Sequence, residues 1–237
     1  MLFSFNNYDL NSAASGTISH MPKKRPAFAI SANAKALSIV VIATASLLTT
    51  STTFAKTILI LGDSISAGYG INVEQGWVAK LQQRLNQKYP KQHQVINASV
   101  SGETTSGALA RLPKLLSTYQ PQVVVIELGG NDALRGQPPA SIQNNLNRIA
   151  TLSKKAKAEP LLLGMKIPPN YGAAYSKAFE QSYVHVAKTQ NISLLPFFLQ
   201  GVAGDNKLMQ KDLVHPTANA QTKLLNNAWP MIEAKLK

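Results

Sequence analysis

Four short polar stretches of the sequence carry the residue types that acyl transfer requires. They are Gly62-Asp63-Ser64-Ile65-Ser66, Ser101-Gly102-Glu103-Thr104, Gly129-Gly130-Asn131-Asp132 and Asp212-Leu213-Val214-His215-Pro216. Each stretch taken alone is also common in ordinary turns and helix caps. Together they offer a nucleophile, a base, a carboxylate and hydrogen-bond donors, which are the groups that serine catalysis uses.

Ser64 is the candidate nucleophile. A serine hydroxyl attacks poorly until a base removes its proton, and His215 offers an imidazole, a group that ordinarily titrates near neutral pH. Such a base needs a carboxylate on its other ring nitrogen to fix its tautomer and orientation. Asp212 lies three residues before His215, so both side chains can lie on one side of a single turn. We therefore predict a catalytic triad of Ser64, Asp212 and His215.

The tetrahedral intermediate of acyl transfer also needs donors aimed at its oxyanion. We predict an oxyanion hole formed by the backbone N–H groups of Ser64 and Gly102 and the side-chain amide of Asn131. A glycine at position 102 lets the backbone approach a substrate closely, and an amide at position 131 donates where a carboxylate does not. Asp63 and Asp132 flank these positions and are expected to brace the loops rather than to react.

The elements that must position these residues follow from the spacing of the apolar side chains. Apolar runs without polar alternation predict buried strands, and apolar residues three or four apart predict helices. The predicted strands are 57–61, 94–97, 123–128, 161–164 and 192–195, and the predicted helices are 76–89, 105–119, 141–157, 171–189 and 217–236. This alternation predicts an α/β fold, a three-layer α/β/α sandwich with a five-stranded parallel, flavodoxin-like sheet. Function in such sheets lies at the carboxyl ends of the strands.

The four stretches resemble those of the SGNH (GDSL-type) hydrolase superfamily, and more narrowly those of the bacterial periplasmic thioesterase, lysophospholipase and arylesterase group. The resemblance covers residues 56–237, and the family's Ser, Gly, Asn and His fall on Ser64, Gly102, Asn131 and His215, with Asp212 as the acid. Ile65 stands where the family name has leucine, which is a conservative difference. The resemblance implies the SGNH fold, an acyl-enzyme on Ser64, and neither a cofactor nor a metal.

The resemblance also implies broad tolerance for acyl-CoA thioesters, lysophospholipids and aryl esters. Residues 133–139 and 166–175, which follow the third and fourth strands, are expected to form the walls of an acyl groove. Within them Leu134, Ile167 and Tyr171 are the predicted substrate-binding residues. A carbohydrate esterase that deacetylates sugars is the alternative, and it would require a short, polar cleft.

The sequence lacks the motifs that rival folds and functions require. An α/β-hydrolase elbow reads Gly-x-Ser-x-Gly, whereas position 66 is a serine here. No Gly-x-Gly-x-x-Gly or Walker lysine follows a strand, which disfavours a nucleotide-binding module, and no His-Glu-x-x-His sequence suggests a metal site. A binding protein without activity would be expected to have lost Ser64 or His215. We expect His93 to be solvated and His185 to be packed rather than catalytic.

Composition limits the remaining possibilities. The chain has 237 residues, enough for one well-buried domain, and no cysteine, which excludes disulfides and a thiol nucleophile. The formal net charge is +13, but the basic residues are scattered and not interleaved with aromatics, which favours a solvated surface over nucleic-acid binding. We expect a monomer that acts on a small acyl ester, thioester or lysophospholipid.

The first 55 residues have the pattern of an N-terminal extension followed by a secretory signal peptide. Lys23-Lys24-Arg25 form a basic region, residues 36–48 are apolar, and Thr53-Phe54-Ala55 resembles a cleavage site. The apolar run is shorter than the roughly 20 residues that a membrane-spanning helix needs. An uncleaved anchor is the alternative, and translation that begins at Met21 would remove the extension. We therefore expect a periplasmic or secreted enzyme that is not stably inserted in the membrane, with its domain at 56–237.

Export should be visible at the mature N-terminus. N-terminal sequencing of the protein recovered from the periplasm or medium should begin at Lys56, because signal peptidase recognises the small residues at 53 and 55. An intact N-terminus on a cytosolic protein would contradict export.

Overall fold

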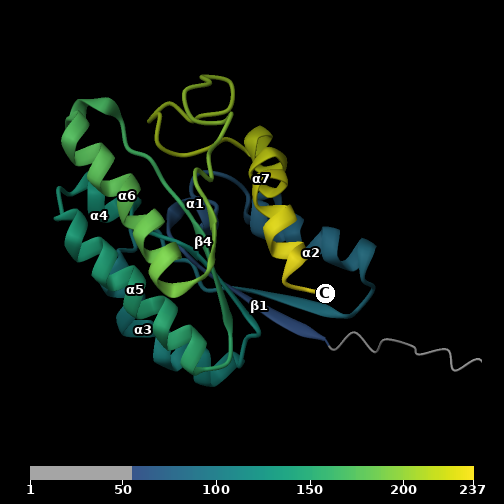
Figure 1. Ribbon diagram of the computed structural model, residues 1–237. Coiled ribbons are helices and arrows are strands. Elements are labelled where there is room, and N and C mark those ends of the chain that lie inside the picture. The colour runs from purple at the N-terminus through teal and green to yellow at the C-terminus, as the bar shows by residue number, and fades with distance from the viewer. Residues whose placement is uncertain (1–54) are drawn as a thin grey trace, which may run out of the picture. The chain divides into compact units, whose positions relative to one another are not determined.

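The computed structural model describes residues 55–237, and residues 1–54, which hold the predicted signal sequence, lie outside them (Figure 1). Five parallel strands form one sheet in the order β2-β1-β3-β4-β5. They are β1 (Lys56–Gly62), β2 (His93–Asn97), β3 (Val123–Glu127), β4 (Glu159–Leu163) and β5 (Ser193–Leu195). The predicted five-stranded parallel sheet is confirmed.

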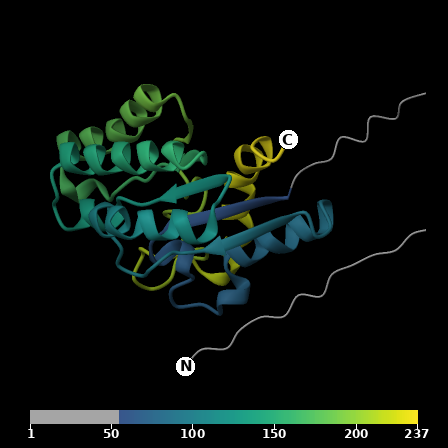
Figure 2. The ribbon, with the colours of Figure 1, turned by 90° about the horizontal axis from the view of Figure 1, so that it is seen from below.

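Helices cover both faces of this sheet, as the right-handed crossovers of parallel strands require. Figures 1 and 2 show α2 (Trp77–Lys88) and α7 (Gln221–Ala234) together on one face. The other face is covered by α3 (Thr105–Tyr119), α5 (Pro139–Lys155) and α6 (Ala173–Gln190). The result is the predicted three-layer sandwich. No helix within residues 55–237 combines the length and apolarity needed to span a bilayer.

Burial explains why the central strands read as unbroken apolar runs. Ile58 to Leu61 in β1 and Val124 to Ile126 in β3 are completely buried, since helices pack on both faces. On α2, Trp77, Leu81 and Leu85 recur at four-residue spacing and face the same core. The sheet is therefore a rigid base whose carboxyl ends can hold side chains in fixed positions.

Short helices are the main elements that apolar spacing did not predict. Helix α1 (Ser64–Ala67) follows β1, and α4 (Gly130–Leu134) follows β3. Three 3₁₀ turns, η1 (Val73–Gln75), η2 (Pro169–Tyr171) and η3 (Ala218–Ala220), are also present, and η3 replaces the start of the predicted last helix. Elements of three to five residues contain too little sequence for a helical period to be recognised.

Two histidines lie differently from their predicted environments. His93 was expected to be solvated, but it is only 6% exposed, because the Tyr89 ring packs against it and its Nδ1 accepts a hydrogen bond from the Lys56 N–H. Burial, and then the charge of Lys56, lower its pKa. His185 was expected to be packed, but it is exposed, because the buried face of α6 consists of Phe179, Ser182, Tyr183 and Val186.

Candidate active site

The chain reverses sharply after β1 and places Ser64 at the first position of α1. Asp63 caps this helix: its Oδ1 accepts a hydrogen bond from the Ile65 N–H at 3.0 Å. Ser64 is 8% exposed, so its hydroxyl lies in a partly desolvated position at the carboxyl end of the sheet. This is where the topology of a doubly wound sheet places function, because β1 and β3 are neighbours and their connections leave in opposite directions.

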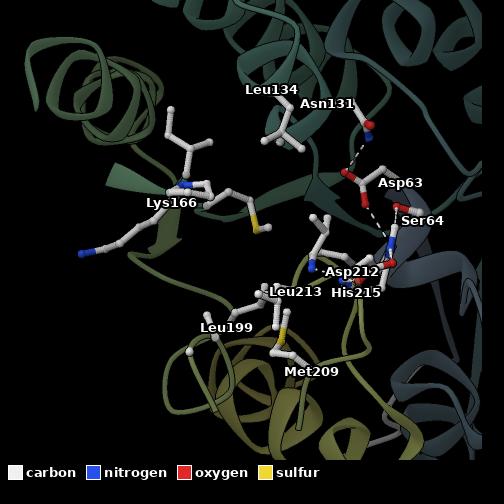
Figure 3. Close-up of a pocket in the computed structure, with 18 of the residues that line it drawn as sticks. Asp63, Ser64, Asn131, Leu134, Lys166, Leu199, Met209, Asp212, Leu213 and His215 are labelled. Atoms are coloured by element: carbon white, nitrogen blue, oxygen red, sulfur yellow. Dashed lines mark hydrogen bonds and ion pairs between the residues drawn. The ribbon is translucent and has the colours of Figure 1, made fainter. Parts of the chain in front are cut away.

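The three predicted triad residues are brought together in hydrogen-bonding order. The Ser64 Oγ lies 2.9 Å from the His215 Nε2, and the His215 Nδ1 lies 2.7 Å from the Asp212 Oδ2 (Figure 3). Ser64 and His215 are 151 residues apart in the sequence. The arrangement allows His215 to take the Ser64 proton while Asp212 fixes the orientation of the ring.

A tight turn sets the position of Asp212 relative to His215. The other carboxylate oxygen, Oδ1, accepts hydrogen bonds from the N–H groups of Val214 and His215, both at 3.0 Å. Leu213, which lies between Asp212 and Val214, adopts a left-handed φ of 58°, which is uncommon for a residue with a side chain. These contacts, first the backbone hydrogen bond from His215, lower the pKa of Asp212 to about 2. The carboxylate is therefore ionised at neutral pH.

Tyr69 and Gln210, which the sequence analysis did not single out, make contacts that help to position His215. The ring of Tyr69 packs on the imidazole with the ring centres 4.5 Å apart. The Gln210 side-chain amide donates to the carbonyl groups of Tyr69 and Pro216, and its backbone N–H donates to the carbonyl of His215. The sequence feature that could have pointed to Tyr69 is Gly68-Tyr69-Gly70, because an aromatic residue between two glycines directly after a predicted catalytic stretch is uncommon in a turn.

Asn131 projects from the first turn of α4, beside Ser64. Its Nδ2 donates one hydrogen bond to the Asp63 Oδ2 at 3.1 Å, which leaves the second N–H of the amide for a substrate (Figure 3). Gly129 permits this turn, because it adopts a φ of 109° and an added methyl group would lie 2.5 Å from the Tyr183 hydroxyl. The Asn131 amide is thus oriented by the carboxylate next to the nucleophile.

Gly102 occupies the third position of a turn closed by a hydrogen bond from the Glu103 N–H to the Val100 carbonyl. Its φ of 78° is that of a type II turn, for which glycine is preferred. The turn does not use the Gly102 N–H, and Arg135 donates to the Gly102 carbonyl at 3.1 Å. The predicted third donor is therefore available, although Gly102 does not line the cavity described below.

Asp132 has the bracing role that was expected for it. Its two carboxylate oxygens accept hydrogen bonds from the backbone N–H (2.9 Å) and the hydroxyl (2.6 Å) of Thr105. Thr105 begins α3, directly after the Gly102 turn, and Asp132 lies in α4, next to Asn131. The contact therefore fixes the Gly102 and Asn131 loops relative to one another.

A cavity of about 580 Å³ opens beside the triad (Figure 3). Leu134 and Ile167, two of the three predicted substrate-binding residues, line it. Tyr171 does not; its hydroxyl donates to the Leu134 carbonyl from behind. Much of the lining comes from the segment after β5, which the sequence analysis did not assign to the groove. Its apolar members are Phe197, Leu199, Ala203, Met209, Leu213 and Val214. Apolar side chains therefore make up much of the cavity wall.

In the part of the chain that the structure describes, the side chains that could hold a metal ion are not gathered into a site. Residues 55–237 contain no group of three or more side chains of His, Cys, Asp or Glu arranged to hold a metal ion.

Comparison with known proteins identifies a family and close relatives. Residues 60–223 match the GDSL-like lipase/acylhydrolase family. The chain is 50% identical over 183 residues to the esterase TesA of Pseudomonas aeruginosa, covering 77% of this chain and 90% of that protein. It is 45% identical over 175 residues to thioesterase 1/protease 1/lysophospholipase L1 of Escherichia coli K12, covering 74% and 82%.

A solved structure agrees with the fold. The psychrotrophic esterase EstA from a Pseudoalteromonas species, in a crystal structure inhibited by monoethylphosphonate, superposes with a TM-score of 0.73 at 44% identity. The match covers 76% of this chain and 98% of that one.

The role of the Asn131 amide can be measured directly. Asn131→Ala should lower kcat by about 10²–10³-fold, the usual effect of losing one oxyanion donor, and should leave the fold intact. Asn226→Ala, which removes an exposed amide on α7 that contacts Arg84, is the matched control and should keep wild-type kcat. An unchanged kcat in Asn131→Ala would remove Asn131 from the mechanism.

Proposed function

Since the chain belongs to the GDSL-like lipase/acylhydrolase family and is an ester and thioester hydrolase of the SGNH fold, we propose that Ser64 is its nucleophile, His215 its base and Asp212 the supporting carboxylate. The observation that carries this proposal is the continuous hydrogen-bonded chain from the Ser64 Oγ through His215 to Asp212. An ionised carboxylate at one end and a partly desolvated hydroxyl at the other are what acyl transfer requires.

Acylation begins when His215 Nε2 takes the Ser64 proton and the Ser64 Oγ attacks the acyl carbon. The C=O π electrons move to the oxygen, which the N–H groups of Ser64, Gly102 and Asn131 stabilise. Asp212 and the Tyr69 ring face the imidazolium, and both favour its positive charge. His215 then donates its proton to the leaving oxygen or sulfur as the tetrahedral intermediate collapses.

Deacylation repeats these steps with water as the nucleophile. His215 removes a proton from the water as it attacks the acyl-Ser64 carbonyl, and the same donors hold the oxyanion. Collapse returns the proton to the Ser64 Oγ and releases the carboxylic acid. No external oxidant, reductant or cofactor enters the balance.

The physiological substrate in this proposal is a lysophospholipid or another lipid ester. The apolar cavity beside the triad can bury an acyl chain, and the name of the Escherichia coli relative includes both thioesterase and lysophospholipase. The sugar deacetylase alternative requires a short, polar cleft, which the lining disfavours. Export is part of the proposal: β1 begins at Lys56, directly after the predicted cleavage site, so removal of the signal would leave the sheet whole. The monomeric state remains a prediction.

Substitution of the triad tests the mechanism. Ser64→Ala and His215→Ala should each lower kcat by about 10⁴-fold or more, and the double variant should lose little beyond either single one, because neither residue acts without the other. A fluorophosphonate should label Ser64 alone. Ser66→Ala is the control for labelling, because its hydroxyl is buried and bonded to Glu127. An adduct on Ser66, with Ser64→Ala still active, would overturn the assignment.

A series of p-nitrophenyl esters of increasing chain length tests the substrate class. If the cavity holds the acyl chain, kcat/KM should rise by up to about fourfold per added methylene until the cavity is filled. Ala203→Phe, which adds bulk to the lining, should lower kcat/KM for long chains and leave acetyl esters unaffected. A preference for acetyl over every longer chain would favour the sugar deacetylase instead.

A further inference from the structure

Two carboxyl groups are buried directly beneath the nucleophile. Glu127, the last residue of β3, is 0% exposed, and Asp63, between β1 and α1, is 2% exposed. They are neighbours because β1 and β3 pair with Gly62 opposite Glu127. Among residues 55–237, neither takes part in an ion pair with lysine or arginine. Two buried, adjacent carboxylates without a basic partner cannot both be ionised at small cost.

The hydrogen bonds around Asp63 are those of an ionised carboxylate. Its Oδ1 accepts from the Ile65 N–H at 3.0 Å, and its Oδ2 accepts from the Asn131 amide at 3.1 Å. Both oxygens therefore act as acceptors from N–H groups. The positive charge that His215 acquires when it takes the Ser64 proton favours the same state.

The hydrogen bonds around Glu127 point to the opposite state. Trp77 Nε1, which can only donate, gives a hydrogen bond to the Ser66 Oγ at 3.1 Å, and the Ser66 hydroxyl donates its own proton to the Glu127 Oε2, 2.7 Å away. The Asp63 N–H donates to the same oxygen at 3.3 Å. In the described part of the chain, the other oxygen, Oε1, is completely buried and has no hydrogen-bond partner, neither a donor nor an acceptor. A neutral O–H group left unpaired there costs less free energy than an unpaired negative charge.

From this accounting we propose that Glu127 carries a proton on Oε1 at neutral pH, which keeps Asp63 ionised as the acceptor that orients the Asn131 amide toward the oxyanion. Glu127 and Asp63 are positioning residues in this scheme, because they act through Asn131 and do not touch the substrate. The scheme rests on the proposed role of Asn131 in the oxyanion hole. It extends that role inward, along a chain of polar groups from Trp77 to Asn131.

Electrostatics support the same placement of the proton. Complete burial, and then the negative charge of Asp63, raise the pKa of Glu127 well above its ordinary value. Burial also raises the pKa of Asp63 to about 6, against the lowering by its hydrogen bonds and by His215. The remaining titratable group close to the pair is the Tyr183 hydroxyl, whose pKa is raised by burial and which donates to the Leu128 carbonyl. Because the Tyr183 hydroxyl donates its proton to that carbonyl, it does not donate a hydrogen bond to either carboxyl group.

Three substitutions test the proposal through kcat and KM. Glu127→Gln keeps the shape of a neutral acid and should retain kcat within about threefold of wild type. Glu127→Leu removes the acceptor for Ser66 and should lower kcat by about tenfold. Asp63→Asn sets an NH₂ group against either the Ile65 N–H or the Asn131 amide, and it should lower kcat by about 10–100-fold with KM nearly unchanged.

Infrared spectroscopy of the folded protein reads the proton itself. At neutral pH the wild type should show the C=O stretch of a protonated, buried carboxyl group, and Glu127→Gln should abolish it. Stability gives a second readout independent of activity. A carboxyl group with a raised folded-state pKa contributes stability at pH values below its unfolded pKa, and this contribution is lost as the pH rises through the folded pKa. The Tm advantage of Glu127→Gln over wild type should therefore grow from pH 5 to pH 9.

The outcomes separate the possible failures. Retained kcat in Asp63→Asn together with loss in Glu127→Gln would place the proton on Asp63 and overturn the proposal, as would the absence of the infrared band. Full kcat in all three variants would mean that the pair positions nothing. If instead Asn131→Ala proves silent while the band is present, the oxyanion-hole assignment fails and the site of protonation stands.

Discussion

The pairing of β1 with β3 is the contact on which the catalytic arrangement depends. The register sets Gly62 opposite Glu127, so the chain leaves both strands at the same level of the sheet edge. Ser64 follows one strand by two residues, and Asn131 follows the other by four. A shift of this register would separate Ser64 from Asn131, the proposed nucleophile and oxyanion donor. Because both strands are buried on both faces, such a shift would also disrupt the core.

The same register brings two acidic side chains into the interior, and this requires compensation. A fold selected for stability alone would not bury Asp63 and Glu127 side by side, since unpaired buried polar groups are unfavourable. The structure compensates with donors from Ile65, Ser66 and Asn131, one of which is a predicted catalytic group. Asn131, the proposed oxyanion donor, is therefore held by a polar network that continues into the core.

The sequence allowed the strands, the long helices and the shared turn of Asp212 and His215 to be predicted because their signals are local. Asp212 and His215 lie in one turn, and the buried strands are contiguous apolar runs. What escaped prediction depends on contacts between distant segments. Tyr69 reaches His215, and Lys56 reaches His93, through contacts that no single stretch of sequence records. Glu127 was visible only as the end of a strand, and its partners Ser66 and Trp77 come from other elements.

The site thus divides into two parts with different physical characters. The proposed nucleophile and the Asn131 amide lie at the sheet edge, where Asp63 accepts hydrogen bonds from the Ile65 N–H and the Asn131 amide. The base lies on an exposed turn, where Leu213 is 65% exposed with a left-handed backbone, and Gln210 and Tyr69 restrain it from outside. The apolar cavity lies between these parts, and much of its lining comes from the segment that carries the base. Changes in that segment can therefore alter which acyl chain fits while the oxyanion donors remain fixed, which is how one rigid sheet edge can serve esterases and thioesterases with different substrates.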